Sequence, residues 1–169
     1  MSELKNAIYP GSFDPVTIGH LNIIRRAAEI FDHLTVCVMV NAGKNPMFTL
    51  EERVDLIRRV TRDLPNVEVD SSGELLAEYA RKKGKCVIVK GLRAGSDFEN
   101  EFQMALINRK INPELDTMFL TSEHQFTYLS SSMVKELGSY DVDLTDFLPA
   151  AIIPDFRKRI EDIRQGGNT

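Results

Sequence analysis

Short apolar runs alternate with amphipathic segments along most of this chain, and this alternation limits the folds open to it. Five runs have the composition of buried strands, at positions 7–9, 34–40, 67–69, 86–90 and 116–121. The segments between them carry apolar residues at helical spacing. Strands that alternate with helices form parallel sheets with helices packed on both faces. The sequence therefore predicts an α/β fold, a doubly wound five-stranded parallel sheet.

Capping signals delimit several of the helices. Thr49 with Glu52, and Ser96 with Glu99, have the spacing of a capping box, in which each side chain bonds the other residue's backbone N–H. Gly84 follows a helix that starts near position 75, and is a candidate C′ residue. The remaining predicted helices cover residues 21–31, 130–137 and, at the C-terminus, 155–163.

The length and charge of the chain exclude some classes of protein. A chain of 169 residues suits one domain spanning positions 1–169, with a tail from about 165 that frays. The net charge of −4 argues against a nucleic-acid partner, which usually selects a basic surface. No apolar stretch approaches the roughly 18 residues that a membrane span needs. Neither a membrane nor a nucleic acid is therefore an expected partner.

Three smaller patterns have structural interpretations. Cys37 and Cys86 each lie in an apolar run without metal-ligand spacing, so we expect buried free thiols and a cytoplasmic protein. Phe98 and Phe102 lie one helical turn apart, and we expect them in the core. The basic clusters 81–83 and 157–159 are expected to be solvated helix faces.

The loop after the first predicted strand has the features of an anion site. Residues 11–20 read GSFDPVTIGH, so a Gly/Pro loop joins a strand to a helix that opens with Gly19 and His20. Backbone N–H groups at a helix start point at an anion, and the helix dipole favours negative charge there. His20 can add a donor to the same anion. This loop indicates a phosphorylated nucleotide as ligand.

Two other unusual loops follow predicted strands, at 90–94 (KGLRA) and 126–132 (FTYLSSS). In doubly wound sheets, ligands bind beyond the carboxyl ends of the strands where the strand order reverses. If the first strand lies beside the fourth, all three loops surround one crevice, and their cations and N–H groups suit a polyphosphate. The sequence has neither a P-loop nor a G-x-G-x-x-G dinucleotide motif, and no HExxH zinc motif or carboxylate cluster for a metal.

Taken together, these segments resemble the nucleotidyltransferase superfamily. Residues 17–20 have the T-x-G-H form of its T/H-x-G-H signature. Four further segments resemble bacterial phosphopantetheine adenylyltransferases in order and spacing: YPGSFDP at 9–15, PMFT at 46–49, GLR at 91–93 and LSSSMVKE at 129–136. The resemblance runs from about Ala7 to Pro149. It implies a Rossmann-like nucleotidyltransferase fold with a C-terminal helix.

The resemblance also implies an activity and a set of site residues. The family transfers AMP from ATP to 4′-phosphopantetheine, giving 3′-dephospho-CoA and pyrophosphate in coenzyme A biosynthesis. His20, which would stabilise the transition state at the α-phosphate, and Lys44, which would orient the acceptor phosphate, are the implied catalytic residues. The implied ATP-binding residues are Ser12, Phe13, His20, Gly91, Leu92, Arg93, Glu101, Phe126, Thr127, Tyr128, Leu129, Ser130, Ser131 and Ser132. The implied acceptor-binding residues are Ser12, Lys44, Leu76 and Lys90.

This reaction agrees with the absence of an obvious general base. The attacking phosphate has a second pKa of about 6, so it is already ionised near neutral pH. Positioning and charge stabilisation are then sufficient for catalysis. We expect Mg²⁺ to enter with ATP, held by phosphate oxygens and water rather than by a protein cluster. By analogy with the family, the chain is expected to form a homohexamer.

One position departs from the family. Lys90 stands where relatives often have arginine, and lysine is a point charge without the bidentate fork of a guanidinium. Two alternatives stay open from the sequence. One is another nucleotidyltransferase, with nicotinate mononucleotide or glycerol 3-phosphate as acceptor. The other is a non-catalytic nucleotide-binding regulator on the same fold, against which the presence of both His20 and Lys44 argues.

Overall fold

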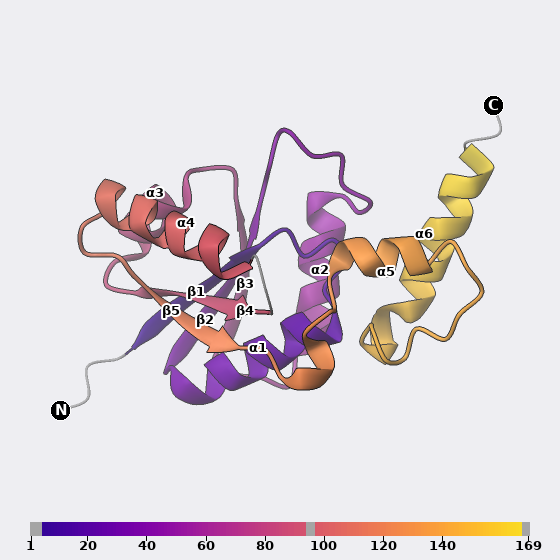
Figure 1. The fold of residues 1–169 in the computed structure, drawn as a ribbon, viewed down its shortest axis with the longest axis horizontal. Helices are drawn as coiled ribbons and strands as arrows, with labels where there is room; N and C mark the ends of the chain where they lie inside the picture. Colours follow the sequence, from indigo (N-terminus) through magenta and orange to yellow (C-terminus); the bar gives the residue numbers. More distant parts are fainter. Residues whose placement is uncertain (1–4, 94–96, 167–169) are drawn as a thin grey trace.

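A computed structural model describes residues 5–93 and 97–166 (Figure 1). Its centre is a parallel sheet of five strands in the order β3-β2-β1-β4-β5. The strands are β1 (Asn6–Gly11), β2 (His33–Met39), β3 (Val67–Ser72), β4 (Val87–Leu92) and β5 (Asp116–Thr121). The predicted fold class is confirmed, and β1 lies beside β4 as the predicted crevice requires.

Six α-helices connect or follow the strands within the described ranges. They are α1 (Ile18–Ile30), α2 (Leu50–Thr61), α3 (Leu76–Lys83), α4 (Asp97–Ile111), α5 (Ser131–Leu137) and α6 (Ile153–Gly166). The C-terminal helix is longer than predicted, because Pro154 is tolerated in a first turn, where its missing N–H has no intrahelical partner. Gln165 and Gly166 belong to α6 rather than to a frayed tail; the rest of the predicted tail, 167–169, lies outside the described residues.

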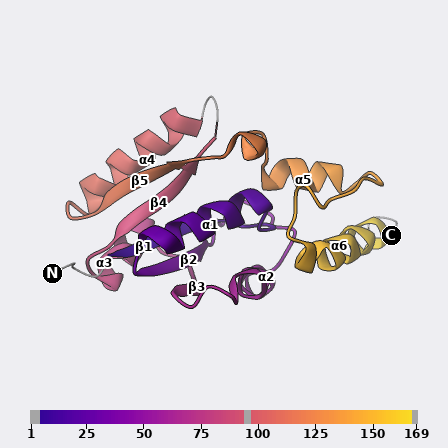
Figure 2. The same cartoon turned by 90° about the horizontal axis from the view of Figure 1, so that it is seen from below.

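The two faces of the sheet are covered by different helices, because side chains alternate along each strand. Ala7 and Tyr9 of β1 point into the larger core with α1 and α2, whereas Ile8 belongs to a second cluster with α3. Helices α3 and α4 pack together on that second side. Helices α5 and α6 extend past the carboxyl ends of the strands, as both views show (Figure 2).

The predicted caps that can be examined are present. Thr49 Oγ1 accepts the Glu52 N–H at 3.2 Å, and Glu52 Oε2 accepts the Thr49 N–H at 2.8 Å, so this capping box is confirmed. Gly84 ends α3 as predicted, but as the C-cap residue rather than at C′, with a φ of 86° and a ψ of −154°, a conformation open essentially only to glycine. Ser96, the predicted cap of α4, lies outside the described residues.

The prediction that Phe98 and Phe102 belong to the core is wrong. Their side chains are 51% and 48% exposed and stack on each other, with ring centroids 5.7 Å apart. Of the described α4 residues only Asn108 is buried, and apolar side chains occur around much of the helix surface. Helical spacing therefore does not indicate which side of α4 meets the sheet, and an apolar surface stays uncovered.

Two other expectations have different outcomes. Cys37 and Cys86 are free and buried, as predicted. The cluster 157–159 is not simply a solvated face, because Arg157 donates to the Val142 carbonyl and Arg159 donates to the Met47 carbonyl. In residues 5–93 and 97–166, no helix combines the length and apolarity needed to cross a bilayer.

Candidate active site

The three loops singled out in the sequence meet at the carboxyl ends of β1, β4 and β5. The chain leaves β1 toward β2 and β3 on one side, and α3 then carries it across to β4 and β5 on the other. The β1–β4 boundary is therefore the point where the strand order reverses. A cavity of about 350 Å³ opens there, lined by all three loops and by the first turn of α1.

Most of the predicted site residues line this cavity. They are Ser12, Phe13, His20, Lys44, Lys90, Gly91, Arg93, Glu101, Phe126, Leu129, Ser130, Ser131 and Ser132. Leu92, Thr127, Tyr128 and Leu76 do not appear among the lining residues. Tyr128 is 80% exposed, and Leu76 starts α3 and packs against the second core cluster. The fold thus brings most of the predicted site residues together from distant segments, and these four lie outside the cavity lining.

His20 occupies the first turn of α1 and has a defined protonation state. Its Nδ1 accepts the backbone N–H of Thr17 at 3.0 Å, and the Thr17 hydroxyl accepts the N–H of His20 at 3.2 Å. Burial lowers the pKa of His20 to about 3, and the positive charges of Arg93 and Lys90 act in the same direction. The ring is therefore neutral, and because Nδ1 accepts, Nε2 carries the proton. His20 offers the cavity an N–H donor.

An aromatic series fixes the ring of His20. The Phe13 ring meets His20 edge-on at 5.0 Å, and Tyr9 meets Phe13 edge-on at 5.2 Å. Phe13 has a φ of 45°, an unusual conformation for a residue with a side chain, and its ring is buried. A Cβ on Gly11 would lie 3.0 Å from that ring, a tighter contact than most side chains make, so a larger residue there would displace the ring. This packing holds the histidine in one orientation.

Each cation on the β4 side of the cavity faces a carboxylate of α4. Arg93 Nε donates to Asp97 Oδ2 at 2.8 Å, and Lys90 Nζ lies 3.4 Å from Glu101 Oε1. Arg93 also donates to the Leu129 carbonyl at 2.9 Å, which ties the β4 loop to the loop before α5. These pairs set the position of both cations and reduce the net positive charge of the cavity.

A second cavity of about 490 Å³ adjoins the first. Ser12, Lys44, Ser131 and Ser132 line both, so the two cavities meet at these residues. Lys44 comes from the loop after β2, and in the described part of the chain it has no carboxylate within ion-pair distance. Ser130 caps α5 by accepting the Met133 N–H at 3.1 Å. The junction therefore combines an exposed cation with hydroxyl groups and the start of a helix.

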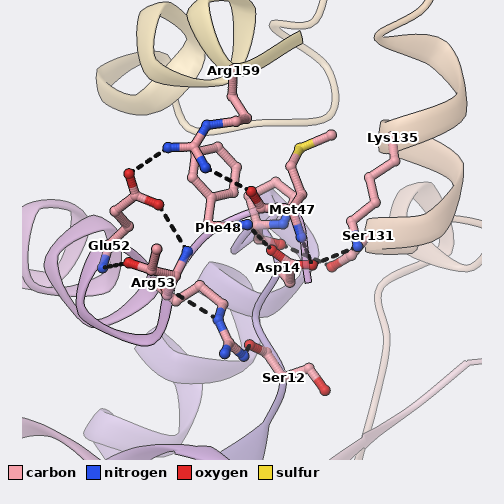
Figure 3. Close-up of polar contacts among 11 residues, drawn as sticks. Ser12, Asp14, Met47, Phe48, Glu52, Arg53, Ser131, Lys135 and Arg159 are labelled. Atoms are coloured by element: carbon pink, nitrogen blue, oxygen red, sulfur yellow. Dashed lines mark hydrogen bonds and ion pairs between the residues drawn. The ribbon is translucent and has the colours of Figure 1, made fainter. Parts of the chain in front are cut away.

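The sequence did not single out every residue that shapes these cavities. Asp97 lines the first cavity, and its spacing of four residues from Arg93 was an available signal for the pair. Asp14 is 5% exposed and pairs with Lys135 Nζ at 2.6 Å (Figure 3). No local pattern marks that pair, because its members are far apart in the chain.

The described residues hold no protein-made metal centre. Across 5–93 and 97–166, no three histidine, cysteine, aspartate or glutamate side chains gather closely enough to hold a metal ion. The two carboxylates that line the first cavity, Asp97 and Glu101, face cations of the protein.

Comparisons with known proteins agree with this architecture. The cytidylyltransferase-like family model matches residues 8–137. The phosphopantetheine adenylyltransferase of Alkaliphilus metalliredigens is 53% identical over 156 residues, covering 92% of this chain and 99% of that protein. The one from Caldanaerobacter subterraneus is 53% identical over 146 residues, covering 86% and 91%.

A solved structure shows the same fold at much lower identity. The nicotinic acid mononucleotide adenylyltransferase of Plasmodium falciparum, complexed with NaAD, superposes with a TM-score of 0.62 at 14% identity, covering 94% of this chain and 96% of that one. This likeness supports the nucleotidyltransferase fold. The sequence relatives show to which group within the family the chain belongs. The chain belongs to the cytidylyltransferase-like family and, within it, to the phosphopantetheine adenylyltransferases.

Proposed function

We propose that this chain transfers the adenylyl group of ATP to 4′-phosphopantetheine, reversibly, giving 3′-dephospho-CoA and pyrophosphate. The observation that carries the proposal is the junction of two cavities at Ser12 and Lys44, with the neutral His20 donor on one side of it. One cavity suits the nucleotide and the other suits a second phosphorylated substrate. The membership of the chain in its family gives these substrates their names.

The residue types at the junction fit a direct displacement. An oxygen of the acceptor phosphate attacks the α-phosphorus of ATP, a new P–O bond forms, and the bond from that phosphorus to the oxygen bridging the β-phosphate breaks. Pyrophosphate leaves with the electron pair. Because the attacking phosphate is already ionised, no side chain has to remove a proton. The protein contributes orientation and charge stabilisation.

We assign the two catalytic residues complementary roles. Lys44 holds the acceptor phosphate and offsets its charge as it approaches the α-phosphate. The Nε2–H of His20 donates to the α-phosphate oxygens as negative charge builds there, and a donor already fixed in place needs no reorganisation. Lys90, like Lys44, faces the acceptor phosphate, whereas Arg93 and the N-terminus of α5 face the remaining phosphates of ATP, where cations and N–H groups suit a polyphosphate.

We propose that Mg²⁺ takes part as a component of the substrate, MgATP. Phosphate oxygens and water supply most of the ligands that this ion prefers. This agrees with the donor set of the cavity, where Asp97 and Glu101 already face protein cations. The metal then neutralises phosphate charge, and the protein provides the surface that orients the complex.

A pyrophosphate-release assay with ATP tests the function. We expect turnover with 4′-phosphopantetheine and at least about a hundredfold lower kcat/KM with nicotinate mononucleotide or glycerol 3-phosphate, because a site built for one acceptor leaves polar groups unpaired with another. Equal turnover with nicotinate mononucleotide would contradict the acceptor assignment. Tight ATP binding without turnover on any of the three would favour the non-catalytic alternative.

We further propose that the working form is a homohexamer in the cytoplasm. The exposed apolar side chains of α4, including Phe98, Phe102 and Leu106, support self-association, since monomers rarely leave such surfaces uncovered. The free thiols Cys37 and Cys86 agree with a reducing compartment. Light scattering of the purified chain tests the assembly, and a monomeric mass at micromolar concentration would contradict it.

A further inference from the structure

The loop that carries Lys44 makes few hydrogen bonds to the rest of the protein. At its start, the Val40 N–H donates to the Ser72 carbonyl at 2.9 Å. Inside the loop, the N–H groups of Gly43 and Lys44 bond only to Asn41, at 3.0 and 3.2 Å, and residues 41–46 are exposed. The position of Lys44 therefore depends on how the far end of the loop, at Met47 and Phe48, is fastened.

Asp14 fastens that end from the side of β1. Its two carboxylate oxygens accept the N–H groups of Met47 at 2.8 Å and Phe48 at 2.9 Å. Both amides lie just before α2, where the helix dipole favours a negative group. Lys135 of α5 reaches the same carboxylate at 2.6 Å (Figure 3). Because Asp14 is nearly fully buried, these bonds are shielded from water and strong.

Arg159 of α6 fastens the same two residues from the opposite side. Its Nη1 donates to the Met47 carbonyl at 2.8 Å, and its guanidinium lies over the Phe48 ring, 5.0 Å from the centroid. Its Nη2 pairs with Glu52, the capping-box residue of α2 (Figure 3). The amide groups at 47 and 48 are thus held by an anion and the carbonyl of 47 by a cation, from two distant parts of the chain.

From this geometry we propose that Arg159 and Asp14 form a clamp on residues 47–48 that positions the Lys44 loop for the acceptor phosphate. Both are positioning residues, since they act through the loop. The proposal rests on the proposed function, which gives Lys44 its role. It also gives α6 a function, although α6 lies beyond the residues matched by the family model.

The alternative is that Arg159 only attaches α6 to α2, and the chain offers a matched control for it. Asp155, also on α6, pairs with Arg59 of α2 at 2.6 Å and makes no hydrogen bond or ion pair with the described 41–48 loop. Asp155→Asn removes an ion pair from the same helix interface without touching the clamp. Arg159→Gln removes the clamp cation and leaves the Asp155–Arg59 pair in place.

Steady-state kinetics on the full chain separate the two interpretations of Arg159, a clamp on the loop or an attachment of α6 to α2. For Arg159→Gln we expect the KM for 4′-phosphopantetheine to rise by about 5- to 20-fold, near the lower end of the effect of losing one charge-assisted hydrogen bond because Arg159 acts through the loop, while the KM for ATP stays within about twofold. Arg159→Lys should recover part of the loss, because it keeps the charge without the fork. Asp155→Asn should leave both KM values unchanged. A parallel rise of both KM values, or no rise at all, overturns the proposal.

Hydrogen exchange provides a second measurement that does not depend on turnover. We expect the Met47 and Phe48 amides to exchange about tenfold faster in Arg159→Gln than in wild type or Asp155→Asn, because local opening is easier when one side of the clamp is missing. Equal exchange in all three proteins overturns the clamp. If wild type shows this protection but does not use 4′-phosphopantetheine, the proposed function fails and the clamp stands.

Discussion

Replacing His20 is the most direct test of the role of the neutral histidine. Two substitutions each keep one of its two contacts, the Nδ1 acceptor or the Nε2 donor, and remove the other. Asparagine places an amide near the position of Nδ1 and can still accept the Thr17 N–H, but it has no donor at the position of Nε2. Glutamine reaches the Nε2 position with an N–H₂ group and loses the contact to Thr17. Loss of one fixed donor to a developing oxyanion costs about 10²–10³ in kcat. We therefore expect His20→Asn to lower kcat by that factor and His20→Gln to lower it less.

The assay is pyrophosphate release at saturating ATP and 4′-phosphopantetheine, between pH 5.5 and 8. Because burial holds the pKa of His20 near 3, wild-type kcat should show no titration of this residue across that range. Thermal unfolding of both variants controls for damage to the cap of α1, which is worth about 1 kcal/mol. An unchanged kcat in His20→Asn refutes the reasoning, and so does a wild-type kcat that requires protonation of His20.

Three further predictions concern stability and assembly. The pKa of His20 is about 3 in the folded chain and about 6.5 when unfolded, so the unfolded state binds more protons between these pH values. The free energy of unfolding should therefore rise with pH in this range, by at most about 2 kcal/mol from pH 5 to 7 since the ring borders an open cavity. His20→Asn should flatten this rise in denaturant titrations. Gly138→Ala would place a Cβ 2.6 Å from the ring of Phe156, which is fully buried, so we expect a loss of about 1–3 kcal/mol, and an unchanged denaturation midpoint would contradict this. Phe102→Glu puts charge on the exposed apolar side of α4, and light scattering should show smaller assemblies; an unchanged mass means that this surface is not an interface.

The parts of the fold that were predictable depend on short-range signals. The five strands and the capping box at Thr49 follow from periodicity and from residues three positions apart, and the structure has them at or near the predicted bounds. The convergence of the Gly11, Lys90 and Phe126 loops was also predictable, because parallel strands bring their carboxyl ends to one edge of the sheet. The roles assigned to the site residues remain predictions.

Other features lay beyond the reach of local patterns. The apolar side of α4 could not be oriented, because apolar residues surround much of the helix and only contacts outside it decide which are covered. The clamp was not visible either: Asp14 bonds residues more than 30 positions away, and Arg159 lies 112 positions from Met47. Only the folded chain brings such pairs together. The sequence pattern by itself therefore predicted a solvated helix face for the basic cluster 157–159.

The pairing of Arg93 with Asp97 and of Lys90 with Glu101 affects which anions the cavity retains. An anion that reaches either cation has to compete with a carboxylate already in contact, so each new bond replaces an existing one. We expect inorganic phosphate to make too few contacts to compensate for this exchange, whereas a nucleoside triphosphate that displaces Asp97 from Arg93 also gains contacts to His20 and the start of α5. We therefore expect the carboxylates of α4 to lower the affinity of this cavity for small anions relative to its affinity for a nucleoside triphosphate.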